Sequence, residues 1–238
     1  MKLIFMAGVF LATIALTAQE VTAQWDFTIG KTASVDGKFN GALQGASRIT
    51  GDAKNGYMLT IGLGENGEGI RFSSGDIPKF NIKGGFRVDS LIQVREQTTK
   101  GNAMVLFDCN YYMSNLPRFR KNPQAMGGYV IKLHRAKNEQ LRPVCVLAHG
   151  DSLEEVYGNL FTVPEYTNFS YSVEYDGVRM VRFYINGKLN REVKAKIGGP
   201  IGQIYKTPNL GDRIGSRYNR FDGSILKLKI TALPLPKK

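Results

Sequence analysis

The sequence has few of the residues that build covalent cross-links and metal centres. Its 238 residues include two cysteines, two histidines and one tryptophan. Two cysteines exclude a disulfide-dense scaffold, and they have no histidine or cysteine neighbours at zinc spacing. Acidic residues are also scarce, with 20 Asp plus Glu against 32 Lys plus Arg and a formal net charge of +12. The chain is therefore strongly basic and offers few carboxylates for catalysis.

Beyond its first residues the chain has no apolar run long enough to cross a bilayer. The start is different: a basic Met1-Lys2 precedes an apolar run from Leu3 to Leu16, and small residues at 21–23 come before Gln24. This pattern predicts a secretory signal peptide over 1–23, while the alternative, a membrane anchor, is disfavoured because the run is too short. We expect residues 24–238 to form one exported domain, extracellular or periplasmic, without a transmembrane anchor.

Helical periodicity is almost absent after Trp25, and short strand-like runs alternate with turns. The 27 glycines fit that number of turns. The pattern predicts an all-β fold, a two-sheet antiparallel β-sandwich. Besides a central hairpin, strands are expected at 45–49, 57–63, 69–72, 86–96, 103–108, 129–135, 143–148, 160–163, 210–214 and 225–232.

The central hairpin spans residues 171–188. Asp176-Gly177 separates two apolar runs and Asn186-Gly187 follows, and both dipeptides tolerate the positive φ of tight turns. A three-residue loop, 176–178, places Val173 opposite Val181 and gives one uniformly apolar face, whereas a two-residue loop mixes the faces. The residues expected in the core are Val173, Val181, Phe183, Ile185 and Ile225, and those expected on the opposite face are Glu174, Arg182 and Tyr184.

Several pieces of the chain resemble a known family. Four segments resemble the closing half of laminin-G-like, concanavalin A-like lectin-glucanase domains. They are Tyr175-Asp176-Gly177, the run 183–187, the run 214–216 and Phe221-Asp222-Gly223. Trp25-Asp26-Phe27 and the run 84–88 resemble the opening and middle of that family. The resemblance covers most of 24–232 and implies a jelly roll. Such folds host lectins, adhesion modules and hydrolases, so the resemblance does not choose among these functions.

Two regions are candidates for ligand binding. The connection from Asn110 to Gly128 is unusually long for a compact domain, and its aromatic and cationic side chains suit an acidic sugar, by stacking and by guanidinium–carboxylate pairing. The alternative is a loop that packs on itself and covers the sheet edge. The second region is a sheet face on which His134 would join the outward residues of the hairpin. The candidate residues are Tyr111, Tyr112, Arg118, Phe119 and Arg120 in the connection, and His134, Glu174, Arg182 and Tyr184 on the face.

Catalytic and metal-site patterns are incomplete. Laminarinase-like hydrolases carry Glu-x-Asp-x-(x)-Glu, and the closest match here is Glu174-Tyr175-Asp176-Gly177-Val178-Arg179, which has arginine in place of the third carboxylate. A lyase could use His134 with tyrosine and arginine to remove a proton next to a uronate carboxylate. Many laminin-G-like domains bind calcium through loop carboxylates. Asp222 matches the family's Phe-Asp-Gly, and Asp26 and Asp36 lie in the opening segment, but the run 225–230 that follows Asp222 is basic. We predict no metal and no cofactor.

These observations favour a secreted, non-catalytic carbohydrate-binding domain for an acidic polysaccharide. The net charge of +12 favours acidic partners, and the chain has no nucleic-acid-binding motif. A carbohydrate-active enzyme, either a lyase or a hydrolase with an unrecognised site, is one alternative. A protein-interaction or adhesion module that uses the 110–128 connection is another.

The first prediction concerns the two cysteines. A strand at 129–135 separates Cys109 from Cys145 in sequence. In a three-strand meander the outer strands lie about 10 Å apart, beyond disulfide reach. Protein purified and denatured without reductant should therefore titrate two thiols with Ellman's reagent. Finding none would mean that the cysteines are bonded and that the strand order is different.

Overall fold

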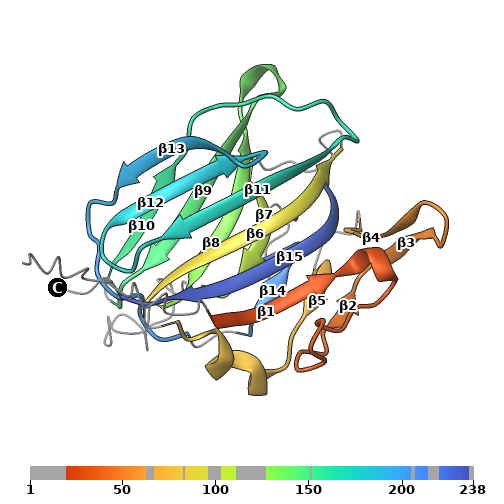
Figure 1. The fold of residues 1–238 in the computed structure, drawn as a ribbon, viewed down its shortest axis with the longest axis horizontal. Helices are drawn as coiled ribbons and strands as arrows, with labels where there is room; N and C mark the ends of the chain where they lie inside the picture. The colour runs from red at the N-terminus through yellow and green to blue at the C-terminus, as the bar shows by residue number, and fades with distance from the viewer. Residues whose placement is uncertain are drawn as a thin grey trace, which may run out of the picture.

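The strands of the chain pack as two antiparallel sheets lying face to face (Figure 1). This is the β-sandwich that the sequence predicts. In Figure 1 the sheet nearer the viewer, here called sheet I, lies in front of sheet II. The computed structural model describes residues 20–62, 67–82, 84–95, 103–110, 127–150, 152–204, 207–213 and 220–235.

Sheet I has the order β13-β12-β11-β6-β15-β4-β3. Strand β1 also pairs with β15, along residues 227–232, whereas β4 pairs with 224–225 at the start of β15. The strands of sheet I are β1 (Glu20–Asp26), β3 (Arg48–Asp52), β4 (Gly56–Thr60), β6 (Gly85–Val94), β11 (Asn168–Tyr175), β12 (Met180–Ile185), β13 (Lys188–Lys194) and β15 (Gly223–Leu233).

Sheet II has the order β10-β9-β8-β7-β14-β5-β2. The predicted meander of three strands is β7-β8-β9, and β10 extends it by one strand. Short 3₁₀ helices occur at η1 (Phe27–Ile29), η2 (Ser74–Phe80) and η4 (Lys137–Glu139). The strands of sheet II are β2 (Ala42–Gln44), β5 (Gly69–Arg71), β7 (Ala103–Asp108), β8 (Tyr129–Arg135), β9 (Leu141–Ala148), β10 (Leu153–Tyr157) and β14 (Asn209–Leu210).

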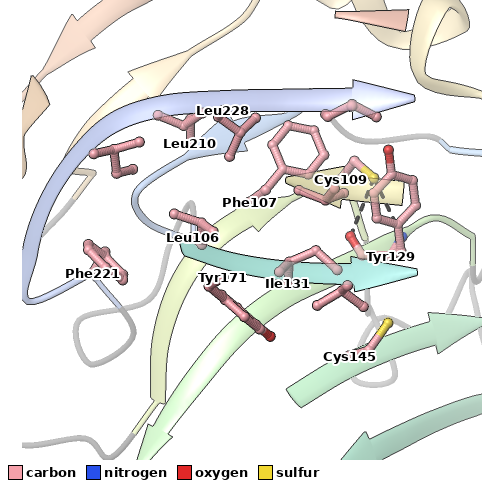
Figure 2. Close-up of a cluster of buried hydrophobic side chains, with 14 of the residues drawn as sticks. Leu106, Phe107, Cys109, Tyr129, Ile131, Cys145, Tyr171, Leu210, Phe221 and Leu228 are labelled. Carbon is pink, nitrogen blue, oxygen red and sulfur yellow. Dashed lines mark hydrogen bonds between the residues drawn. The ribbon is translucent and has the colours of Figure 1, made fainter. Parts of the chain in front are cut away.

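The core lies between the inner faces of the two sheets. Phe86 of sheet I stacks on Tyr129 of sheet II, with ring centroids 4.2 Å apart. Figure 2 shows this region, in which Cys109 directly follows β7 and Cys145 lies in β9, the strands on either side of β8. Both thiols are buried and free, and the Cys109 Sγ donates to the Tyr129 carbonyl at 3.3 Å. This arrangement agrees with the strand order expected from the sequence.

The central hairpin has the predicted faces but not the predicted pairing. Val173, Val181 and Phe183 are fully buried and Ile185 is partly buried, while Glu174, Arg182 and Tyr184 point to the other side. Val173 lies opposite Phe183, not opposite Val181. The pairing is shifted by two residues because the loop is 177–179. The Asp176 carboxylate accepts the backbone N–H groups of residues 178, 179 and 180 and so holds Asp176 in the ladder.

Other expectations need correction. The strand expected at 160–163 is reduced to one bridge between Phe161 and Leu141. Of the strand expected at 45–49, residues 45–47 are a turn between β2 and β3 and residues 48–49 begin β3, and β14 ends at Leu210. Strands β1, β2, β10 and β13 were not expected. The second turn, Asn186-Gly187, is a two-residue hairpin loop with positive φ at both residues. Such a loop joins two paired strands, so this dipeptide already indicated the strand β13 that follows it.

Strand β1 begins at Glu20, within the segment expected to be the signal peptide. Trp25 and Phe27 follow the expected cleavage point, and both are fully buried. Within the described ranges, no helix combines the length and apolar character needed to span a bilayer.

The second prediction tests the core position of Phe183, whose side chain is fully buried. Phe183→Ala should lower the free energy of unfolding by ~3–5 kcal/mol, because it removes buried apolar surface and leaves a cavity. Urea denaturation followed by tryptophan fluorescence measures this loss. Val178→Ala is the control, since Val178 is 47% exposed in the hairpin loop and its truncation should change stability by about 0.5 kcal/mol or less. Equal small losses in both variants would contradict the register.

Candidate functional site

A row of alternating charges crosses four strands on the outer face of sheet I. Glu192 of β13, Arg182 of β12, Glu174 of β11 and Arg87 of β6 lie opposite one another in register. Glu174 receives both arginines, from Arg182 Nη1 at 2.9 Å and Arg87 Nη1 at 3.1 Å. At the two ends, Arg182 Nε donates to Glu192 at 2.5 Å and Arg87 Nε to Asp89 at 2.9 Å. We call these five residues the charge row.

The charge row fixes its arginines in position and in the protonated state. Hydrogen bonds from Arg182 to Glu192 and then to Glu174 raise the pKa of Arg182. Burial lowers the pKa of Arg87, but Asp89 and Glu174 outweigh burial and the net shift is upward. The side chains of both arginines are 31% exposed. Each uses Nε and Nη1 within the row, so Nη2 has no bonded partner among the described residues and remains available to a ligand.

An aromatic and an aliphatic side chain lie next to the charge row. The guanidinium of Arg87 lies over the Tyr184 ring, 4.9 Å from its centroid. On the neighbouring strand, Leu189 is opposite Tyr184 in register and is 57% exposed. Arg87 therefore covers one side of the tyrosine ring. The face combines fixed hydrogen-bond donors and acceptors with a limited apolar surface, which are the elements that bind the hydroxyls and C–H groups of a sugar.

The structure brings together three of the expected site residues, Glu174, Arg182 and Tyr184. Sequence reasoning missed their partners Arg87, Asp89 and Glu192. Arg87 and Asp89 alternate with apolar residues in a predicted strand, but nothing in the sequence indicates that this strand pairs with β11. Glu192 lies in β13, which the Asn186-Gly187 turn could have indicated.

The expectation that His134 shares this face is wrong. His134 is on β8 of sheet II, beside Lys132 and away from the core residues Ile131 and Leu133. It therefore lies on the outer face of the opposite sheet (Figure 1). The reason is pairing order: β8 pairs with β7 and β9, whereas β11 and β12 pair with each other and with β6 and β13.

The candidate residues of the long connection, Tyr111, Tyr112, Arg118, Phe119 and Arg120, lie outside the described residues. The two ends of the connection are described. The Asn110 side chain donates to the Gly127 carbonyl at 3.1 Å, and the Gly128 N–H donates to the Gly202 carbonyl at 3.1 Å. The connection therefore begins and ends at neighbouring points, at the end of the β7–β8 pair.

The two carboxylates of the hydrolase-like sequence already have structural partners. Both oxygens of Glu174 accept from arginines, and Asp176 accepts three backbone N–H groups of its turn. Glycoside hydrolysis needs one carboxyl group that donates a proton and a second that acts as nucleophile or base. Glu174 and Asp176 instead serve as hydrogen-bond acceptors within the fold.

The three aspartates considered for calcium, Asp26, Asp36 and Asp222, also have partners within the fold. Asp26 accepts from Thr28 and pairs with Lys227 at 2.9 Å, and Asp36 accepts from Ser34 at 2.6 Å. Asp222 is fully buried, with Arg220 Nε at 3.7 Å. Across the described ranges, no three His, Cys, Asp or Glu side chains lie close enough to hold a metal ion.

A buried pair of acidic residues joins three loops near the start of β15. The Asp212 carboxylate accepts the backbone N–H of Glu68 at 3.0 Å, and the Glu68 side chain accepts from Ala46 N–H and Ser47 Oγ. Asp212 is 3% exposed and Glu68 is 3% exposed. Burial raises the pKa of Asp212 from its ordinary 3.8 to about 6, and the Glu68 charge adds to the shift.

No protein-family model matches the sequence, and no curated protein matches it. Solved structures do match its fold. Domain 4 of the GH43 extracellular arabinanase of Geobacillus stearothermophilus, in complex with arabinotriose, aligns over 91% of this chain and 94% of that one, with a TM-score of 0.58 and 19% identity. The binding domain of botulinum neurotoxin serotype D/C aligns over 91% of this chain with a TM-score of 0.59 and 13% identity.

A botulinum neurotoxin DC binding domain in complex with SialylT aligns over 91% of this chain, with a TM-score of 0.56 and 14% identity. The alignments cover 49% and 48% of the two toxin chains, so this chain spans about half their length. At these identities the likeness establishes a shared β-sandwich fold.

The third prediction concerns Asp212. Because its pKa is raised from 3.8 to about 6, the folded protein retains, between these values, a proton that the unfolded chain has released. The contribution of Asp212 to stability is therefore greatest below about pH 4, and it is lost as the pH rises through about 6. Asp212→Asn removes this dependence. As the pH rises across that window, the unfolding free energy of the variant should increase relative to that of the parent by roughly 2–3 kcal/mol. Urea denaturation at several pH values measures this difference.

Asp76→Asn is the matched control for this experiment. Burial raises the pKa of Asp76, but hydrogen bonds from Lys79 and Ser73 outweigh burial and lower it overall. The stabilising effect of Asp76 is therefore lost as the pH falls, and its variant should show a difference of the opposite sign. A difference for Asp212→Asn that does not change with pH would show that this carboxyl ionises normally.

Proposed function

We propose that this protein is a secreted, non-catalytic carbohydrate-binding domain that binds a polysaccharide through the outer face of sheet I. The observation that carries the proposal is the pair of arginines held by Glu174, at 2.9 and 3.1 Å, beside Tyr184. Because the arginines are already fixed, binding a sugar to their free Nη2 groups costs little additional side-chain entropy. The face is therefore organised before a ligand arrives.

The charge row suits sugar hydroxyls, which both donate and accept hydrogen bonds. Its two guanidinium groups are donors, and its carboxylates Asp89, Glu174 and Glu192 are acceptors. Leu189, 57% exposed, and the partly exposed Tyr184 offer contact to sugar C–H groups. The fold likeness supports the same role, because the arabinanase domain that aligns over 94% of its length was solved with arabinotriose. The toxin domains are weaker support, since only about half of each chain aligns.

The polysaccharide we favour is acidic. The net charge of +12 attracts anionic polymers over the range set by the Debye length. Within this proposal the connection from 110 to 128 contributes Arg118 and Arg120 as readers of carboxylate or sulfate, and Tyr111, Tyr112 and Phe119 as stacking groups. Secretion follows from the signal-like segment at 1–23.

The fourth prediction tests this function with an array of neutral and acidic polysaccharides, combined with analysis of reaction products. The parent protein should bind without releasing new reducing ends or unsaturated products, and its affinity should fall with salt. The double variant Arg182→Gln, Tyr184→Ala should bind about tenfold more weakly, because it removes a charged donor and an apolar contact. Arg48→Gln is the control, since Arg48 is exposed on β3 at the far edge of the same sheet.

A second pair of variants tests the long connection. Arg118→Ala with Arg120→Ala should weaken acidic ligands far more than neutral ones, because only acidic groups pair with guanidinium in a bidentate manner. Tyr112→Ala should weaken both kinds, because stacking does not depend on ligand charge. Binding to no polysaccharide would contradict the proposed function, and product release would show that the protein is an enzyme.

A further inference from the structure

The outer face of sheet II carries a second cluster of polar side chains, far from the charge row. Lys132 and His134 project from β8, Arg142 from β9, and Glu155 and Tyr157 from β10. These five residues are called the sheet II cluster. The register brings them together, since His134 lies opposite Arg142, and Lys132 and Tyr157 both lie opposite Val144. Four buried valines, Val105, Val130, Val144 and Val146, form the apolar floor beside them.

Glu155 organises this cluster, and none of the described residues pairs with Arg142. One oxygen of Glu155 accepts from Lys132 Nζ at 2.7 Å, and the other accepts from the Tyr157 hydroxyl. The Glu155 charge is thereby paired with Lys132, whose side chain is only 12% exposed. Arg142 is exposed and has neither an ion pair nor a hydrogen bond from its side chain within the described part of the chain. The cluster therefore keeps a net positive charge at Arg142.

Two aromatic side chains belong to the same cluster. His134 meets the Tyr157 ring edge-on, with centroids 6.0 Å apart. Burial, together with the charges of Lys132 and Arg142, lowers the pKa of His134 despite the opposing charge of Glu155. The imidazole is therefore neutral at neutral pH. Its Nε2 is buried and makes no hydrogen bond, so this nitrogen cannot reach a substrate proton. The cluster is suited to binding and not to proton abstraction.

The charge balance of the two faces differs. On sheet I, Arg87 and Arg182 are matched by Asp89, Glu174 and Glu192. Within the sheet II cluster, Lys132 and Arg142 are accompanied by one described acid, Glu155. An anionic group gains more from an uncompensated guanidinium, which it can engage through two parallel N–H···O bonds, than from one already neutralised by carboxylates.

We infer that the sheet II cluster is a second saccharide-binding site, specific for a sugar that carries a carboxylate or sulfate. Arg142 binds the anionic group, and Tyr157 and His134 contact the sugar ring. The inference rests on the proposed function, because it assumes that the ligand is a polysaccharide. The two sites lie on opposite outer faces of the sandwich (Figure 1). One sugar unit cannot contact both, so the protein binds two units and can bridge two polysaccharide chains.

The fifth prediction tests Arg142 with three probes: an oligogalacturonate, its methyl ester, and a sulfated dextran oligosaccharide. Arg142→Gln should weaken binding by about tenfold for whichever acidic probe the parent binds, the oligogalacturonate or the sulfated dextran, because a charge-assisted bond is lost. Binding of the neutral methyl ester should change by less than about twofold. The oligogalacturonate and the sulfated dextran distinguish carboxylate from sulfate recognition. Arg48→Gln again serves as the control, because it removes one exposed arginine from a different edge of the protein.

Nuclear magnetic resonance of the His134 ring provides a readout that does not depend on affinity. An anion at Arg142 offsets the positive charges of Lys132 and Arg142, so the pKa of His134 should rise when the acidic probe is bound. Binding should then strengthen as the pH falls through the pKa of His134. The groups that face His134 and set this response are Lys132, Arg142, Glu155 and Tyr157.

The outcomes separate this inference from the proposed function. The second site is overturned if Arg142→Gln binds every probe like the parent and the His134 signals do not move. If Arg182→Gln still loses binding in that case, only the site on sheet I is supported. Both proposals fail if the parent binds none of the three probes and no polysaccharide on the array. Loss of acidic binding together with a rise in the pKa of His134 supports the second site.

Discussion

The pleat of the β-strands is the constraint on which the rest of this structure depends. Side chains alternate between the two faces of a strand, so burying Val173, Val181 and Phe183 forces Glu174, Arg182 and Tyr184 outward. A slip of one residue would bury these charges between the sheets, at a large cost in free energy. The Asp176 carboxylate opposes such a slip because it accepts the three N–H groups of the turn.

The same constraint produces two outer faces with different electrostatics. On sheet I, registered strands align opposite charges into a row, and each guanidinium is neutralised by carboxylates at 2.5–3.1 Å. Under the proposed function, such a face would recognise a ligand by the geometry of its hydrogen bonds. On sheet II, Glu155 is saturated by Lys132 and Tyr157, and no described residue pairs with Arg142. The proposed second site on that face would depend more strongly on salt.

This division has a consequence for how a β-sandwich acquires function. The inner faces must satisfy packing, and their aromatic contacts, such as Phe86 on Tyr129, hold the two sheets together. The outer faces are free of that demand, so polar residues on them can change with little effect on the fold. Proteins that share 11–19% identity with this chain share its sandwich, and two of the solved structures hold different molecules, arabinotriose in one and SialylT in the other.

Local patterns of the sequence determined the all-β class, the two-layer arrangement, and the inward and outward faces of the central hairpin. These depend on short-range properties, namely the period of two along a strand and the turn chemistry of Asp176-Gly177 and Asn186-Gly187. The placement of β8 between Cys109 and Cys145 could also be predicted from sequence, because neighbouring strands of a meander are consecutive in the chain. Local patterns also identified Glu174, Arg182 and Tyr184 as residues of one face.

Only the tertiary structure decided which distant strands pair. Arg87 reaches Glu174 because β6 pairs with β11, 87 residues further along the chain, and His134 is separated from them because β8 belongs to the other sheet. Strand pairing across such distances is set by the combined packing of many buried side chains, and no local pattern encodes it. The composition of each outer face follows from that pairing, so the charge row and the sheet II cluster could not be assembled from sequence alone.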